Sequence, residues 1–440
     1  MVSTTRVALD QPSRRFLGGL VVIVLIGAAI RLGYVWFDRR HAAEIFNDGF
    51  YYHYGANLLA DGHGFVNPFE WVLRGRSLQS ADHPPLYLVY LAGFSAIGIR
   101  STTSHLVVSA LLGVAAVAVA GLVGRRIAGE RVGLIAAGLV AVYPNIWRFD
   151  GALLSEGAVI LLVLVIVWLS YRFWDHRSRG RLVALGAAIG LATLSRAELL
   201  LLVPLLLVPL GLLAREVSWR TRGAWVALAV VVCGGVLVPW VAYNRSRFDE
   251  PVYLSQNLGS TLAGSNCPTV YDGELLGYWD FNCPVRAIDA SDLPSSSDPR
   301  ADAVARRAGL TYLGDHLDRL PVVVAARLGR IVGVYRPTQQ RDLDTLTEGV
   351  SSWVATAGMI TLPFVLVGAA AGGVVLRRRG RLVLPLVAPI AVVLVTVVVF
   401  YAATRFRSTA EGPLCVLVAV GLDALWNRTP WGRPSEDALS

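Results

Sequence analysis

Lysine is absent from this 440-residue chain, so all 40 of its Lys and Arg positions are arginine. Charge of either sign is scarce, since 16% of the residues are charged, 55% are hydrophobic and the mean hydropathy is +0.55. So little polar surface cannot cover a water-soluble globule, and a bilayer must therefore solvate most of the chain. The formal net charge of +9 does not indicate a nucleic-acid partner, because the arginines stand in short clusters between apolar runs.

Several catalytic signatures are also missing. The sequence has no Walker-type phosphate loop, no GxGxxG after a strand, and no CxxC or HExxH pattern. Nucleotide-driven and zinc-protease chemistry are therefore unsupported, no cofactor is predicted, and no metal ligands are assigned. Of the four cysteines, Cys267 and Cys283 lie in one polar interval and are predicted to form a disulfide, whereas Cys233 and Cys415 lie in apolar runs.

Long apolar runs are the dominant feature of what is present. Crossing about 30 Å of hydrocarbon takes roughly 20 apolar residues in a helix. The sequence therefore predicts an all-α polytopic membrane protein with about ten transmembrane helices, two of them short, and with interfacial helices in two extracytoplasmic loops. The predicted spans are 16–37, 102–123, 132–147, 153–173, 182–194, 199–213, 224–243, 350–376, 382–403 and 413–426.

Arginine clusters predict the orientation. Those near 125–131, 172–181, 215–222 and 377–381 all fall on one side if both termini are cytoplasmic, as the positive-inside rule requires. Loops 38–101 and 244–349 then lie outside the cell membrane. The predicted organisation is an N-terminal transmembrane module at 1–243 that includes loop 38–101, an extracytoplasmic loop with an interfacial helix at 244–349, further transmembrane helices at 350–426, and a cytoplasmic tail at 427–440.

The first outside loop begins with a polar and aromatic segment, predicted to form an interfacial helix over 47–62. Asp48, Tyr51 and Tyr52 share one face of that helix because they are spaced i, i+3 and i+4. A carboxylate there could serve as a general base toward an acceptor hydroxyl. An N-cap aspartate followed by interfacial tyrosines is the alternative, and spacing alone does not separate the two.

Three further polar positions stand where helices enter the outer interface. His83 precedes two prolines at the start of a second interfacial segment. It could have a function there, or it could simply be a polar residue at the start of a helix. Glu156 could bind a base, a metal or a sugar hydroxyl, or it could cap the next helix with Ser155. Arg196 suits a lipid-borne phosphate, although pairing with Glu198 or snorkelling would explain it equally well.

The second outside loop combines amides and aromatics, a mixture that suits sugar binding but is also common on surface loops. Asn257 lies in its first part and Trp279 in its second. A later apolar segment, 320–336, places Arg327 and Arg330 on one side of a predicted interfacial helix.

Four polar features follow one another along the chain: Asp48 in the first outside loop, the His-Pro-Pro-Leu segment at His83, the Leu-Ser-Glu helix start at Glu156 and the Leu-Ser-Arg turn at Arg196. In this order they resemble the motifs of the C-type glycosyltransferases of membranes. The branch that looks most similar contains the protein O-mannosyltransferases and the aminoarabinose transferase of lipid A. The resemblance extends from about Arg31 to about Gly421. It implies transfer of a sugar from a polyprenyl-phosphate donor to a glycan, lipid or protein acceptor, on the outside face and without a nucleotide sugar.

The resemblance also implies roles for residues. Asp48 matches the catalytic aspartate that deprotonates the acceptor, and Glu156 matches the acidic position after the third span. Arg196 and His83 fall where members of the family place cations toward the donor phosphate. The expected lining of the substrate site is Tyr51, Tyr52, Asn257 and Arg336. The stretch from Cys267 to Cys283 and the segment around Arg336 look like an actinobacterial subgroup, and the acceptor stays open.

Two other functions stay open at the sequence level. A transporter or lipid flippase would keep ionisable residues near the midplane or broken helices in repeated halves. Glu156, Glu198 and Glu411 instead fall near predicted outer helix ends, which argues against a proton-coupled pathway. A non-catalytic scaffold for envelope synthesis is the third hypothesis.

Overall fold

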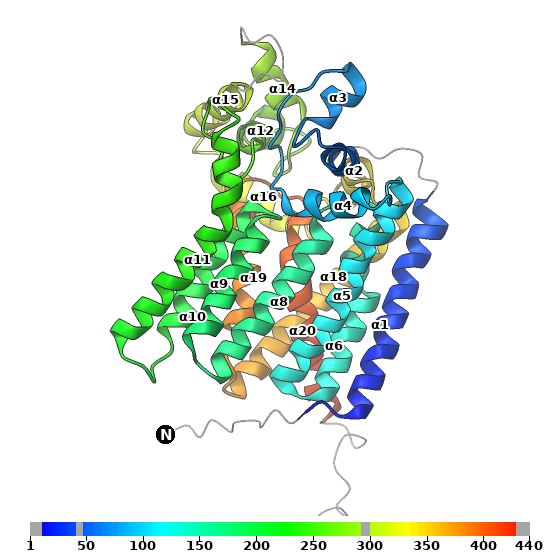
Figure 1. Ribbon diagram of the computed structural model, residues 1–440, viewed down its shortest axis with the longest axis vertical. Helices are drawn as coiled ribbons and strands as arrows, with labels where there is room; N and C mark the ends of the chain where they lie inside the picture. The colour runs from blue at the N-terminus through cyan, green and yellow to red at the C-terminus, as the bar shows by residue number, and fades with distance from the viewer. Residues whose placement is uncertain (1–10, 41–46, 292–299, 428–440) are drawn as a thin grey trace, which may run out of the picture.

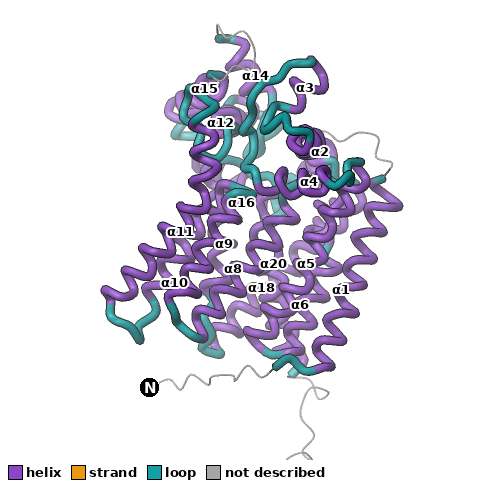
Figure 2. Tube along the Cα trace, viewed as in Figure 1, coloured by secondary structure: helices purple, strands orange, loops and turns teal. Residues whose placement is uncertain are grey.

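The computed structural model describes residues 11–40, 47–291 and 300–427, and these residues form helices and turns with no strand among them. This confirms the predicted all-α class. Nearly all of the predicted tail at 427–440 lies outside the described residues. Figures 1 and 2 show a tilted bundle with a second layer of shorter helices over one of its ends.

Within the described residues, six segments are long and apolar enough to cross a membrane. A seventh candidate is a bent pair, in which α6 (Glu130–Val142) meets the segment Pro144–Gly151 at 58°. The predicted span 132–147 is thus broken rather than continuous, because Pro144 cannot donate a hydrogen bond back into α6. The six are α1 (Arg14–Tyr34, continued by a π-helical turn to Arg39), α5 (Thr102–Ala128), α8 (Glu156–Asp175), α11 (Trp219–Arg245), α18 (Ser352–Arg378), and α20 (Ser408–Trp426) with the turn before it.

Three other predicted spans are shorter helices within the bundle. The first is α9 (Arg179–Thr193), the second is the segment Ala197–Leu212, which ends in α10 (Val208–Leu212), and the third is α19 (Leu384–Val399). All three lie beside the long helices in Figure 1. By length and composition the structure therefore supports six or seven full spans, and the predicted count of about ten is not established.

A buried arginine closes the break after α6. The last carbonyls of a helix lack partners within the helix. Arg31, which is fully buried in α1, donates to the carbonyls of Val140 and Ala141 at the end of α6. Its Nε lies 3.1 Å from a carboxylate oxygen of Asp150 just beyond the bend. One buried side chain thus holds both sides of the bend.

Glycines allow the long helices to pack closely, as is common between membrane helices. A Cβ atom at Gly372 of α18 would lie 1.8 Å from the carbonyl oxygen of Leu417 in α20. A Cβ at Gly186 of α9 would lie 2.2 Å from the carbonyl oxygen of Ala229 in α11. These backbones touch only because the side chains are absent.

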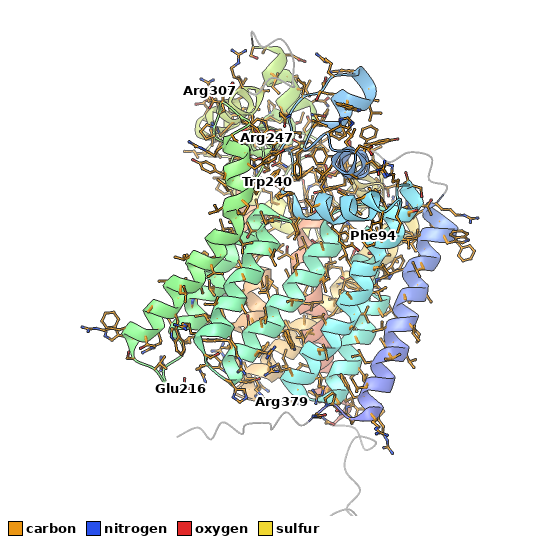
Figure 3. The ribbon with its side chains drawn as sticks, in the orientation of Figure 1. Phe94, Glu216, Trp240, Arg247, Arg307 and Arg379 are labelled. Atoms are coloured by element: carbon orange, nitrogen blue, oxygen red, sulfur yellow. A yellow bond between two sulfur atoms is a disulfide. The ribbon has the colours of Figure 1, made fainter. Side chains whose placement is uncertain are left out.

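The two ends of the bundle differ. Glu216 and Arg379 lie at one end, whereas Arg247 and Arg307 lie in the layer at the other end, as Figure 3 shows. This second layer comes from the two predicted outside loops. Its helices are α2 (Asn47–Ala60), α3 (Pro68–Arg74), α4 (Leu86–Ala96), α12 (Leu258–Ser265), α13 (Pro268–Tyr271), α14 (Asn282–Asp289), α15 (Ala301–Asp315), α16 (Leu320–Ile331) and α17 (Pro337–Glu348), while α7 (Pro144–Trp147) begins the bent segment after α6.

Candidate active site

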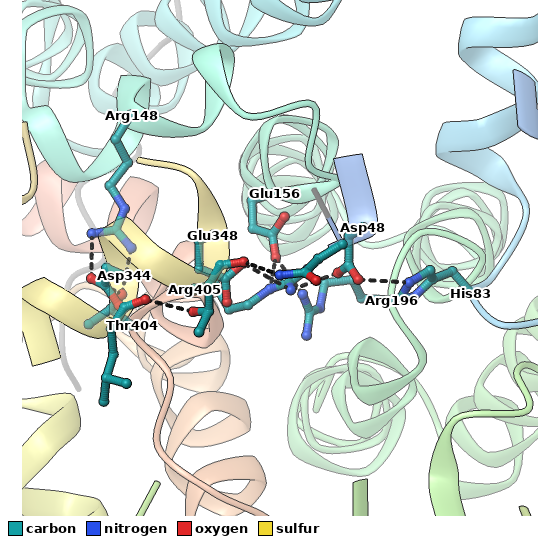
Figure 4. Close-up of polar contacts among 12 residues, drawn as sticks. Asp48, His83, Arg148, Glu156, Arg196, Asp344, Glu348, Thr404 and Arg405 are labelled. Atoms are coloured by element: carbon teal, nitrogen blue, oxygen red, sulfur yellow. Dashed lines mark hydrogen bonds and ion pairs between the residues drawn. The ribbon is translucent and has the colours of Figure 1, made fainter. Parts of the chain in front are cut away.

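Asp48 lies in the first turn of α2, where the helix meets the end of the bundle. One carboxylate oxygen is 3.2 Å from Nε2 of His83, and the other is 2.7 Å from a guanidinium nitrogen of Arg405 (Figure 4). The preceding residue, Asn47, has a left-handed backbone (φ +49°), and its side-chain amide donates to the carbonyl of Thr347. This contact docks the start of α2 against α17, so Asp48 points inward.

Arg405 connects the site. Besides Asp48, its guanidinium contacts Glu156 at 2.7 Å and Glu348 at 3.1 Å. These three carboxylates come from the starts of α2 and α8 and from the end of α17, and all of them converge on the turn before α20 (Figure 4).

Arg405 and Glu348 were not predicted from the sequence. Arg405 lies between two predicted spans, which is the same signal that singled out Arg196, so the sequence offered a reason to select it. Glu348 ends a polar helix two residues before the predicted span 350–376, so its position beside an apolar run was a similar signal.

Arg196 lies between two carboxylates. Its guanidinium makes ion pairs with Glu156 and Glu198, and it also covers the ring of Phe406 at 5.1 Å from the centroid. The pairing with Glu198 that the sequence left open is thus present in the structure. Arg196 and Arg405 share Glu156, which is fully buried and holds both cations at one place.

The buried setting changes the acidities of the groups around Arg405. Burial opposes ionisation of Asp48, but the positive charges of His83 and Arg405 outweigh it and lower the pKa of Asp48. Burial acts to lower the pKa of His83, but the charge of Asp48 raises it above its ordinary value. Burial raises the pKa of Glu348 to about 7 despite Arg405. At neutral pH, Asp48 is therefore ionised, whereas Glu348 keeps its proton to a higher pH than an ordinary glutamate.

A second polar cluster holds the turn that carries Arg405. Asp344 of α17 accepts hydrogen bonds from Thr404 at 2.6 Å and from Arg148 at 3.1 Å, and Arg148 also donates to Thr404. All three side chains are buried. Buried polar groups are stable only when paired, so this cluster fixes the backbone one residue before Arg405.

The remaining predicted site residues divide into two groups. Tyr51 and Tyr52 are buried against the His83 ring, with centroids at 5.1 and 5.2 Å, so they support His83. Asn257 accepts from the hydroxyl of Ser255, and exposed Arg336 donates to the carbonyl of Glu274. Neither of these last two predicted residues contacts the ion-pair cluster in the described part of the chain.

Cys267 and Cys283 are joined by a disulfide, while Cys233 and Cys415 are free and buried. Together with Asp280, the bonded pair forms the one group in the described ranges whose atoms have the spacing of metal ligands. Sulfurs bonded to one another are not the thiolates that bind metals, so the disulfide, rather than a metal, accounts for this group.

Comparison with known proteins supports the fold. Residues 82–243 match the family described as dolichyl-phosphate-mannose-protein mannosyltransferase, while no curated protein sequence matches the chain. The archaeal oligosaccharyltransferase AglB from Archaeoglobus fulgidus, in complex with an inhibitory peptide and a dolichol-phosphate, is similar over 97% of this chain, with TM-score 0.57 and 17% identity. Its apo form gives TM-score 0.57 and 15% identity, also over 97% of this chain.

The chain spans about half the length of these archaeal proteins, since 52% of each is covered. ArnT from Cupriavidus metallidurans, bound to undecaprenyl phosphate, is 19% identical over 94% of this chain and 79% of its own, with TM-score 0.43. With its bundle and helical layer, and with residues 82–243 matching the mannosyltransferase family, the chain has the fold of the C-type membrane glycosyltransferases.

Proposed function

We propose that this protein transfers a sugar from a polyprenyl-phosphate donor to an acceptor hydroxyl or amine on the extracytoplasmic face, with inversion. The observation that carries this proposal is the convergence of Asp48, Glu156, Arg196 and His83 around Arg405 at the loop-side end of the bundle. A membrane-anchored donor would present its phosphate at this depth while its lipid tail stays between the spans.

The proposed reaction is one displacement at the anomeric carbon. The acceptor oxygen or nitrogen forms a bond to that carbon, and the bond from the carbon to the phosphate oxygen breaks. Asp48 takes the acceptor proton, and the electron pair leaves with the polyprenyl phosphate. A phosphate leaving group stabilised by cations needs no proton of its own, so one carboxylate base is enough.

The ion pairs explain how Asp48 would gain basicity when the donor binds. Without a donor, Asp48 is held by His83 and Arg405, and its lowered pKa makes it a weak base. A donor phosphate would compete for the same cations, with His83 and Arg196 as its proposed ligands. If the phosphate draws His83 away from Asp48, the pKa of Asp48 rises, and the base is activated only in the donor complex.

Glu156 has a supporting part in this scheme. It lies between Arg196 and Arg405 and contacts both. By holding two like charges at one place, it would keep the phosphate site assembled before the donor arrives. Tyr51 and Tyr52 would hold the His83 ring in line with Asp48.

The test is the variant Asp48→Asn, incubated with radiolabelled polyprenyl-phosphate mannose or arabinose and an envelope extract. We expect transfer to fall by about 10² to 10⁴, the usual contribution of a general base, while membrane insertion is kept. Asp61→Asn is the matched control, because Asp61 lies just after α2 in an exposed pair with Arg100. Full transfer by Asp48→Asn would remove the catalytic assignment.

A further inference from the structure

Aromatic side chains form a row that leads away from the Arg405 cluster. Phe406 follows Arg405 in sequence, and its ring centroid lies 4.9 Å from that of Tyr401. Tyr401 lies 6.1 Å from Trp279, and Trp279 lies 5.8 Å from Phe281. The row begins at the turn before α20, where Phe406 is buried, and ends next to α14, where Phe281 is 65% exposed.

Trp279 is held rigidly although it is only partly buried. Its indole nitrogen donates to the carbonyl of Ser260, and a Cβ atom at Gly264 would lie 2.0 Å from that nitrogen. The Cys267–Cys283 disulfide encloses the segment. These contacts fix a large aromatic ring before any ligand arrives, which lowers the entropy cost of binding.

The middle of the row carries an unused polar group. The Tyr401 hydroxyl has no hydrogen-bond partner in the part of the chain that the structure describes. The charges of Arg405 and Glu348 are close enough to act on it. Tyr401 lies in the break between α19 and α20, and the amide of the next residue, Ala402, donates to the carbonyl of Gly277 at 3.1 Å. The break therefore lies directly against the segment that carries Trp279.

We infer that Trp279 and Tyr401 form the binding surface for the sugar ring of the donor. This inference rests on the proposed function and adds to it the residues that recognise the sugar. The carbon-bound hydrogens of a sugar ring are weakly positive and stack on the negative face of an aromatic ring. The free Tyr401 hydroxyl supplies a hydrogen bond to a sugar hydroxyl.

Position favours a sugar over the lipid tail. The anomeric carbon is one bond from the phosphate oxygen, so a sugar must lie beside the cations that hold the phosphate, and Phe406 lies under Arg196. A lipid tail must run toward the bundle core, whereas this row runs toward α14 in the loop layer (Figure 1). A hydroxyl near several charges also suits a polar ligand better than a hydrocarbon.

The experiment measures binding of polyprenyl phosphate to the full chain in nanodiscs, with the lipid either bare or bearing mannose, glucose or arabinose. We expect the wild type to bind at least one sugar-bearing lipid about tenfold more tightly than the bare lipid, a gain comparable to that of one base stacked on an aromatic ring. Trp279→Ala should remove that preference and leave binding of the bare lipid unchanged. Tyr401→Phe, which keeps the ring, should lose part of it.

Tyr253→Ala is the matched control, since Tyr253 is 62% exposed in the same loop and lies outside the row. An equal loss of affinity for bare and sugar-bearing lipids in Trp279→Ala would overturn the inference and indicate a lipid contact. An unchanged preference in both Trp279→Ala and Tyr401→Phe would also overturn it. These outcomes leave the proposed function standing, because transfer dependent on Asp48 is measured separately.

Discussion

Arg405 is the residue on which the site depends most. It lies among three carboxylates and its side chain is 12% exposed. Removing one partner from a buried ion pair typically costs about 3–5 kcal/mol, because the remaining charge is left unpaired. Arg405→Ala should therefore lower thermal stability as well as abolish transfer, and Arg405→Lys should restore stability better than activity because an ammonium lacks the planar fork.

Two variants make this expectation specific. Arg100→Ala, which removes an exposed ion pair with Asp61, should change stability by at most about 1 kcal/mol. Asp48→Asn combined with Arg405→Ala should recover part of the stability, because Asp48 is ionised at neutral pH and loses its Arg405 partner in the single variant. If Arg405→Ala melts at the temperature of the wild type, the three carboxylates do not depend on Arg405.

His83 makes activity dependent on pH. Asp48 raises the pKa of His83 above its ordinary value, so the pair contributes stability that is full below about pH 6.5 and is lost as pH rises through the raised pKa. The pKa of Asp48 is lowered, so Asp48 stays ionised at neutral pH and does not set the acid limb. We expect transfer to decline on the alkaline side, and His83→Lys should move that decline to higher pH.

Glu348 is a second group whose titration could shape the pH profile, since its pKa is about 7. The pH dependence of the transfer rate in Glu348→Gln distinguishes titration of Glu348 from titration of His83. A decline that persists in Glu348→Gln and moves in His83→Lys belongs to His83. A decline that disappears in Glu348→Gln would assign it to Glu348 instead.

At the scale of the elements, glycines determine how closely the backbones of neighbouring long helices approach. Gly372 and Gly373 are neighbours in α18, but a Cβ atom at Gly372 would lie 1.8 Å from a backbone oxygen of α20, whereas a Cβ at Gly373 meets nothing within 4 Å. Gly372→Ala must therefore separate the two helices, while Gly373→Ala gains helix propensity at no steric cost.

We expect Gly372→Ala to lower the melting temperature in detergent clearly and Gly373→Ala to leave it unchanged or raise it slightly. Equal melting temperatures for the two variants would show that α18 and α20 do not approach so closely at Gly372.

Element breaks were the least predictable part of the fold. Apolar runs are plain in the sequence but the bend at Pro144 is not, because proline inside a run can either kink a membrane helix or end it. The bend depends on Asp150, which lies just beyond it, and on Arg31 of α1, which lies far from Pro144 in the sequence. The interfacial helices were easier to predict: 47–62 corresponds to α2, and 320–336 contains α16.

At the scale of the whole molecule, the first described helix begins, and the last one ends, on the side of the arginine clusters. Ser13 before α1 bonds Glu130, and Arg131 and Arg379 both pair with Asp423 near the end of α20. We propose that this side is cytoplasmic and the helical layer extracytoplasmic, as the positive-inside rule predicts.

Cysteine labelling tests this orientation in intact cells. Arg307→Cys in the layer should react with a membrane-impermeant maleimide, whereas Arg379→Cys and Glu216→Cys at the opposite end should react only after lysis (Figure 3). The native cysteines give little background, because two are bonded and two are buried. Labelling of Arg379→Cys in intact cells would reverse the topology.

Helical structure and a membrane environment follow from the amino-acid sequence alone. Long apolar runs are solvated by lipid, and in lipid the backbone N–H and C=O groups must bond one another, which a helix allows. The sequence also singled out Asp48, His83, Glu156 and Arg196, because each stands at the predicted outer interface and their order resembles that of the C-type glycosyltransferases. Only the packed chain shows that Arg405 and Glu348 join these residues, and that Asn257 and Arg336 do not. Contacts between residues hundreds of positions apart depend on how α2, α8, α17 and α20 pack, and no local pattern records that packing.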